Sequence, residues 1–188
     1  DLTVLAALLA GCGINPIPTL DERAKAAWSQ VLNQYQRRAD LIPNLVETVK
    51  GFAEQESKVL TEVIEARAKA SQVKIPEDIL TNKEAFDKFQ DAQNNLSGAL
   101  GRLLVVVERY PDIKSNQNFL ALQSQLEGTE NRISVARRDY IASVEAYNTE
   151  IRTFPGRIWH TIMYGDMPIR QTFEATTAGA ETAPQVKF

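Results

Sequence analysis

The chain has 188 residues and a mass of 21.0 kDa, which is enough for one domain with a hydrophobic core. A formal net charge of −3 gives no electrostatic basis for binding nucleic acid, and we expect no such partner. A single cysteine, Cys12, excludes an intramolecular disulfide, and a single histidine, His160, leaves few candidates for a metal site or a catalytic triad. We therefore expect no metal, no cofactor other than a covalent lipid, and no enzymatic activity.

The N-terminal segment is an apolar run, residues 2–10, that ends in Leu9-Ala10-Gly11-Cys12. This is the pattern of a bacterial lipoprotein signal, in which a diacylglycerol is attached to the cysteine sulfur and the chain is cut before it. The run is shorter than the roughly 20 apolar residues that span a bilayer, and it fits the apolar region of a signal peptide. We expect residues 1–18 to be a signal or anchor with its linker, Cys12 to be lipidated, and the protein to face the periplasm as a lipoprotein. An uncleaved helix in the inner membrane is the alternative.

The first predicted helix begins at Thr19-Leu20-Asp21-Glu22, which has the pattern of a capping box. Apolar residues then recur at spacings of three and four, and their phase does not change across Pro43 or Gly51. Because a loop normally resets this phase, we predict one long helix over residues 19–71, kinked near Pro43, with two stacked helices as the alternative. The apolar seam of this segment consists of Trp28, Val31, Tyr35, Ile42, Leu45, Val49, Phe52, Val59, Val63 and Ala66.

Two more apolar seams with helical spacing follow. They predict helices over residues 82–110, ending before Pro111, and over residues 115–154, ending at Pro155-Gly156. The second of these seams includes Phe154. The fold class is therefore all-α: an elongated antiparallel helical bundle of three long helices, or of four if the first is split near Pro43 or Gly51. We assign residues 19–173 to the bundle domain and expect residues 174–188 to form a flexible tail.

Four motifs resemble the signature of the LemA family, and the resemblance covers residues 19–173. They are Gln34-Tyr35-Gln36-Arg37-Arg38-Ala39-Asp40-Leu41-Ile42-Pro43-Asn44-Leu45, Glu108-Arg109-Tyr110-Pro111-Asp112-Ile113-Lys114, Leu126-Glu127-Gly128-Thr129-Glu130-Asn131-Arg132-Ile133, and residues 147–156. The resemblance implies an all-helical domain behind an N-terminal membrane anchor, and it does not imply an enzyme. Some relatives in this family are associated with membrane remodelling, including magnetosome formation. Many carry a transmembrane helix where this chain carries Cys12.

Arg38 lies on the apolar seam of the first helix, where an unpaired charge would be destabilising by several kcal/mol. Glu127, Glu130 and Asp139 on the last long helix are the candidate partners. We expect a structural polar pairing that fixes the register of the helices, because buried polar residues do so in other long bundles. The alternative is a charged site for a ligand or a second subunit.

Two features outside the seams suggest interaction surfaces. Val46, Val105 and Val106 offer more apolar surface than a monomeric three-helix bundle needs, so we expect a homo-oligomer. Residues 157–164 follow the Pro155-Gly156 stop and are predicted to form a short helix or turn against one end of the bundle. An interfacial position with Trp159 and Tyr164 at the level of the lipid headgroups is the second interpretation of this segment.

Two functional hypotheses follow. The first is a membrane-anchored, non-enzymatic helical scaffold or assembly protein of the bacterial cell envelope that self-associates at the membrane and contacts other envelope proteins. The second is an accessory binding module that regulates or feeds a membrane protease or transporter. The first predicts oligomers and the second a stable monomer with one exposed groove.

Overall fold

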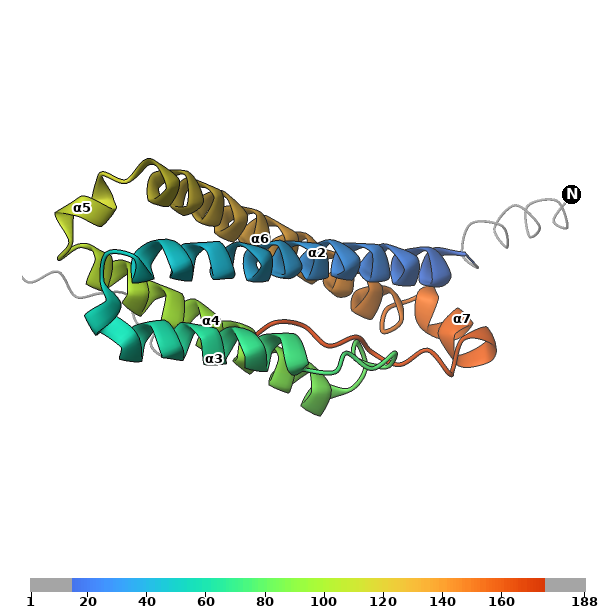
Figure 1. Cartoon of the computed structure of the whole chain (residues 1–188). Helices are drawn as coiled ribbons and strands as arrows, with labels where there is room; N and C mark the ends of the chain where they lie inside the picture. Colours follow the sequence, from blue (N-terminus) through green and yellow to red (C-terminus); the bar gives the residue numbers. More distant parts are fainter. Residues whose placement is uncertain (1–14, 175–188) are drawn as a thin grey trace, which may run out of the picture.

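The computed structural model describes residues 15–174, and the predicted lipid site at Cys12 and the predicted tail from residue 175 onward lie outside them. The described chain is helical and contains no strand, which confirms the all-α class (Figure 1). Its elements are α2 (Pro16–Lys50), a 3-10 turn η1 (Glu54–Glu56), α3 (Ser57–Gln72), α4 (Lys83–Val107), α5 (Pro111–Lys114), α6 (Gln117–Glu150) and α7 (Gly156–Met163).

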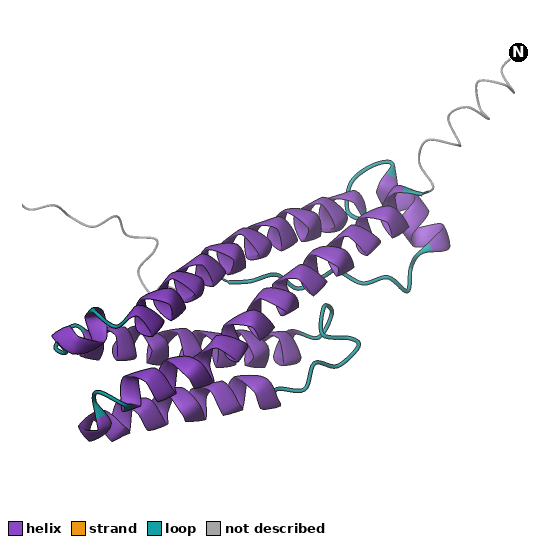
Figure 2. Cartoon of the chain, turned by 45° about the horizontal axis from the view of Figure 1, so that its top comes forward, coloured by secondary structure: helices purple, strands orange, loops and turns teal. Residues whose placement is uncertain are grey.

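The helices form two antiparallel pairs that lie side by side in an elongated rod (Figure 2). The long pair is α2 with α6, and the shorter pair is α3 with α4; α3 also packs on α2. With 35 residues, α2 is the longest helix. At 1.5 Å per residue it spans about 50 Å, which sets the length of the rod.

The prediction of one helix over residues 19–71 was wrong, and the alternative with four long helices is the observed one. α2 ends at Lys50, the chain reverses through η1, and α3 runs back along α2 (Figure 1). The break lies at Gly51 and not at Pro43, which is inside α2. An unchanged seam does not exclude a reversal, because two antiparallel helices that face the same core both direct their apolar side chains inward.

Three predicted details of the helix ends also differ. α2 begins at Pro16, where a proline loses no hydrogen bond, and the Thr19 hydroxyl donates to the carbonyl of Asn15 at 2.8 Å, so there is no capping box at Thr19. Pro111 not only follows α4 but starts α5. Phe52 and Phe154 were placed on apolar seams, yet both are exposed because they lie in the turns after α2 and α6.

α2 continues through Pro43 because α3 supplies the missing hydrogen-bond donor. A proline has no N–H, so the carbonyl of Ala39, four residues earlier, loses its intrahelical partner. The Nε of Arg67 on α3 donates to this carbonyl at 2.8 Å. The side chain of one helix therefore completes the backbone of the other.

Replacing Arg67 with alanine should lower the free energy of unfolding by about 1–2 kcal/mol, because the Ala39 carbonyl loses its partner. The loss should be smaller in a Pro43→Ala background, where the restored N–H of residue 43 bonds Ala39 within the helix. Urea denaturation of the two single variants and the double variant measures this coupling. An equal loss in both backgrounds would show that the Arg67 hydrogen bond does not compensate for Pro43.

The core consists of three clusters along the rod. The distal cluster is mainly aliphatic and joins the second half of α2 to α3, α4, α5 and the first part of α6. The aromatic cluster surrounds Trp28, whose ring centroid lies 5.2–6.1 Å from four other aromatic rings. The pole cluster lies where α2 begins and α7 packs, and consists of Ile17, Tyr147 and Ile151 with Leu20, Trp159, Tyr164 and Met167 against them. The rings around Trp28 are Phe86, Phe89, Tyr140 and Phe173.

Residues 165–174 form an extended strap that closes the aromatic cluster. The hydroxyl of Tyr140 donates to the carbonyl of Gln171 at 2.7 Å, and Asn148 exchanges two hydrogen bonds with the backbone of Arg170. The Nε of Arg170 donates to the buried Asp21 of α2 at 2.7 Å. Hydrogen bonds from the strap to α6 and α2 therefore hold Phe173 over Trp28.

Burial of the Tyr140 side chain raises the pKa of its hydroxyl above the ordinary value of 10, and burial also raises the pKa of Tyr35 and Tyr147. The unfolded chain ionises these tyrosines near pH 10 while the folded chain keeps them neutral. The free energy of unfolding should therefore fall as the pH rises above about 10. Chemical denaturation at a series of alkaline pH values measures the slope. Tyr140→Phe should make the slope shallower, and a slope equal to that of the parent protein would contradict this explanation.

Candidate functional site

The most polar point of the interior is the guanidinium of Arg38 on α2, which is only 1% exposed. Its Nη1 donates to the hydroxyl of Ser97 at 2.6 Å and to a carboxylate oxygen of Glu130 at 3.0 Å. Its Nη2 donates to the backbone carbonyl of Gln93 at 3.1 Å and to the side-chain oxygen of the same residue at 2.7 Å. One side chain therefore joins α2 to α4 and α6.

The surroundings of Arg38 stabilise its charge without fully burying the counter-ion. The Glu130 side chain is 41% exposed, so its carboxylate keeps part of its hydration, which lowers the desolvation penalty of the pair. The ring of Tyr35 lies one turn earlier on α2, and its centroid is 5.1 Å from the guanidinium carbon. The network lies between the distal and aromatic clusters, where it interrupts the apolar packing at one level of the rod.

The structure brings together only one of the three proposed carboxylates with Arg38. Glu130 makes the ion pair, whereas Glu127 is exposed and accepts a hydrogen bond from Gln123 at 3.1 Å. Asp139 is also exposed and lies on the opposite face of α6 from Glu130, because nine residues correspond to about two and a half helical turns. Only one face of α6 can reach Arg38.

Sequence reasoning missed Gln93 and Ser97. Gln93 is a polar residue on the otherwise apolar seam of α4, and it is buried. The position of Gln93 could have revealed its role, because a buried amide requires a hydrogen-bond partner. Arg38, on the apolar seam of α2, also required more hydrogen-bond partners than one carboxylate provides. Ser97 lies one turn after Gln93, and its hydroxyl donates to the Gln93 carbonyl at 3.1 Å while it accepts from Arg38.

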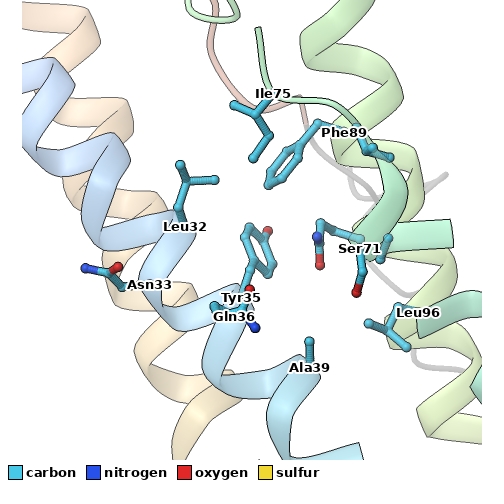
Figure 3. A pocket seen from close by; sticks show the side chains of 12 residues that line it. Leu32, Asn33, Tyr35, Gln36, Ala39, Ser71, Ile75, Phe89 and Leu96 are labelled. Atoms are coloured by element: carbon cyan, nitrogen blue, oxygen red, sulfur yellow. The ribbon is translucent and has the colours of Figure 1, made fainter. Parts of the chain in front are cut away.

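Beside this network, a groove of about 310 Å³ opens between α2, the end of α3 and α4 (Figure 3). Gln93 lines the groove and also bonds Arg38, so the groove and the buried charge share one amide. The mixed lining suits a ligand with an apolar body and a few hydrogen-bonding groups. The lining residues are Leu32, Asn33, Tyr35, Gln36, Ala39, Ala70, Ser71, Val73, Ile75, Phe89, Gln93 and Leu96.

The side chains of the groove are suited to binding. They offer amides, two hydroxyls and apolar surface, and none of them is a carboxylate, histidine, lysine or cysteine. Across residues 15–174, no three His, Cys, Asp or Glu side chains come close enough together to hold a metal ion. The tyrosine hydroxyl in the groove has a raised pKa because it is buried.

The two aromatic residues proposed for a membrane interface, Trp159 and Tyr164, lie at one end of the bundle. Trp159 and Tyr164 are half-buried and pack against the pole cluster. The exposed apolar residues of this segment are their neighbours Ile158, Ile162 and Met163, and the exposed Phe154 lies just before it. The first interpretation of this segment, a short helix against one end of the bundle, is therefore confirmed, and the exposed apolar surface consists of other side chains than Trp159 and Tyr164.

Of the three valines proposed as excess surface, only one is exposed. Val46 and Val106 are buried in the core, because α3 folds back on α2 and covers a second face of the bundle. Val105 is 71% exposed on α4. No helix among residues 15–174 combines the length and the apolar character needed to cross a bilayer.

Comparisons with known proteins agree with the sequence motifs. Magnetosome protein MamQ 2 of Paramagnetospirillum magneticum is 30% identical over 158 residues, covering 75% of this chain and 58% of the relative. Magnetosome protein MamQ of Magnetospirillum gryphiswaldense is 26% identical over 157 residues with the same coverage, and Protein LemA of Metamycoplasma hominis is 24% identical over 119 residues, covering 63% of this chain and 50% of the relative. This chain thus spans less than two thirds of the length of these relatives, none of whose names denotes an enzyme. The sequence model of the LemA family matches residues 27–188, and the chain belongs to that family.

Proposed function

We propose that this protein is a membrane-tethered, non-enzymatic helical scaffold of the bacterial cell envelope that self-associates at the membrane. The observation that carries the proposal is the position of the start of α2. It lies at one end of the rod, beside α7, and the apolar residues 2–10 with Cys12 precede it in the chain (Figure 1). We call this end the α7 pole. A tether there leaves the long faces of α2, α3, α4 and α6 free for contacts between proteins.

The polar interior supports a scaffold. Arg38 and its partners on α4 and α6 form cross-links between helices, which fix the register of long elements that could otherwise slide. Asp21 and Arg170 form a second such cross-link, between α2 and the strap. These buried charged groups are engaged in holding the rod in one shape. The magnetosome relatives suggest a role at a membrane for this chain as well.

Self-association is supported by apolar side chains on the outer faces. Val105 on α4 and Val135 on α6 are exposed. Val135 lines a shallow groove of about 480 Å³ between α2 and α6, together with the small residues Ala26, Ala27 and Ala136. Small side chains in a groove allow a helix of a second copy to approach closely.

Light scattering on the full chain, extracted from bacterial membranes in detergent, tests the assembly. We expect a molar mass above that of the monomer, rising with protein concentration. A single monomeric species at every concentration would contradict the scaffold. The tether is tested separately by intact mass: we expect a chain that starts at Cys12 with an acyl increment, and an unmodified Cys12 within a longer chain would contradict lipidation.

The groove beside Arg38 favours a second candidate, an accessory binding module that regulates or feeds a membrane protease or transporter (Figure 3). This candidate predicts a stable monomer. Leu32→Trp would fill the groove and should abolish partner binding while leaving the molar mass unchanged. A groove-filling variant that keeps partner binding would exclude this candidate.

A further inference from the structure

α7 and the turn before it present exposed apolar side chains, although the inner side of α7 is firmly packed. Phe154 and Ile162 are 82% and 71% exposed, and Ile158 and Met163 are about half exposed. Twelve large hydrophobic side chains are exposed among residues 15–174, and these four fall within ten consecutive positions. Single exposed hydrophobic residues are common on protein surfaces, whereas a local concentration marks a contact surface.

The remaining residues of α7 hold this surface in place. Trp159 packs into the pole cluster, and a ring nitrogen of His160 lies 2.9 Å from the carbonyl oxygen of Met167. A Cβ at Gly156 would overlap the carbonyl oxygen of Glu150, so α7 starts directly against the end of α6. Because α7 is fixed from its inner side, Ile158 and Ile162 cannot turn into the core. We define the α7 face as Phe154, Ile158, Ile162 and Met163.

The charges near the α7 face favour an anionic surface. Arg152 and Arg157 are exposed, and neither forms an ion pair in the part of the chain that the structure describes. The acidic residues near α7 are the exposed Asp166 and the half-buried Glu150, whose carboxylate lies against Gly156 at the start of α7. Exposed apolar side chains beside arginines are typical of segments that lie at the boundary between headgroups and acyl chains.

We propose that the α7 face docks on the surface of an anionic lipid bilayer, with its four apolar side chains at the boundary between headgroups and acyl chains. This inference rests on the proposed tether, because α2 begins at the α7 pole and Cys12 lies four positions before Pro16 in the sequence. A bilayer that holds the lipid of Cys12 lies next to the α7 face. The bilayer therefore contacts the rod twice, through the N-terminal segment and through α7.

The two tryptophans of the chain provide the test. Trp28 is buried in the aromatic cluster, whereas Trp159 is half-buried on α7, so lipids with brominated acyl chains can quench only Trp159. The full chain is reconstituted on vesicles of phosphatidylethanolamine and phosphatidylglycerol with brominated chains, and both sedimentation and fluorescence are measured. We expect the chain to sediment with the vesicles and Trp159 to be quenched. Trp159→Phe should leave an unquenched signal from Trp28.

Variants of exposed residues supply the controls. Ile158→Ser with Ile162→Ser should lower the quenching on the order of tenfold without releasing the tethered chain, because two apolar side chains no longer enter the bilayer. Val105→Ser makes the same chemical change on α4, away from α7, and should leave the quenching unchanged. Vesicles of neutral phosphatidylcholine should give weaker quenching, because the arginines lose their counter-charge.

Each other outcome has a distinct meaning. A chain that sediments with vesicles but shows no quenching of Trp159 overturns the docking of α7 and leaves the tether intact. A chain that does not sediment with the vesicles overturns the proposed tether, and it also overturns the docking of α7, which rests on that tether. Serine variants that lower the molar mass in light scattering, with quenching unchanged, would assign the α7 face to a second copy of the chain and overturn the proposal.

Discussion

Arg38→Ala is expected to lower the free energy of unfolding by about 3–5 kcal/mol, the range found when one partner of a buried ion pair is removed. The variant leaves the amide of Gln93 without a partner and opens a cavity among three helices. Urea denaturation followed by circular dichroism measures the loss.

Neighbouring variants separate charge from packing at this position. Arg37→Ala is the matched control, because Arg37 precedes Arg38 on α2 and is exposed; it should change stability by less than about 0.5 kcal/mol. Arg38→Met fills the space with an uncharged apolar side chain, so its free energy of unfolding should fall less than that of Arg38→Ala. If Arg38→Ala is no more destabilised than Arg37→Ala, the network does not hold the three helices together.

The second large effect is expected for Trp28→Ala, at about 3–5 kcal/mol, the range for removing a buried aromatic side chain. Trp28 contacts aromatic rings from α4, α6 and the strap, so its removal leaves a cavity that no single element can fill. The strap should also loosen, because Phe173 packs on the Trp28 ring at 6.1 Å between centroids.

Denaturation and limited proteolysis together measure both consequences of Trp28→Ala. We expect a lower urea midpoint and faster cleavage within residues 165–174. Trp159→Ala is the matched control, since Trp159 is half-buried in the pole cluster; it should lose less stability and leave cleavage next to Phe173 unchanged, because Trp159 contacts the other end of the strap, at Met167. Equal losses for the two variants would mean that the aromatic cluster is not the main core of this part of the rod.

The spacing of apolar residues predicted the helices well, because each long helix has one buried stripe. α4 and α6 begin and end within a few residues of the predicted limits, and asparagines cap both, with the side-chain oxygens of Asn82 and Asn116 accepting from Ala85 and Phe119. A split at Gly51 was only the alternative to one long helix, because helical periodicity reports which face is buried and not whether the chain turns back. Nor could the spacing reveal that Arg67 compensates for Pro43, which depends on two helices meeting.

The candidate site was predicted in part, for a similar reason. A charge on an apolar seam indicated that Arg38 has a partner, and the helical spacing of α6 limits that partner to one face. The identity of the carboxylate that pairs with Arg38 depends on the axial register of α2 against α6, and no local sequence pattern determines this register. The α7 face was assigned to Trp159 and Tyr164 on residue type alone, whereas the direction of each side chain depends on how α7 packs against the pole cluster.

The proposals describe a rod with two unequal ends. The α7 pole carries the start of α2 and a fixed apolar face, and the opposite end carries the reversal between α2 and α3 and the short helix α5 (Figure 1). A rod held at the α7 pole would stand away from the bilayer and present its sides to neighbouring copies. Its buried cross-links would keep those sides in a constant shape.

Neutron reflectometry on the full chain tethered to a supported bilayer of phosphatidylethanolamine and phosphatidylglycerol tests this account most directly. A rod held at the α7 pole predicts a protein layer that extends about 50 Å from the lipid headgroups, the length of α2. A layer of about 20 Å, the thickness of two packed helices, would show that the rod lies flat and would contradict attachment through one end.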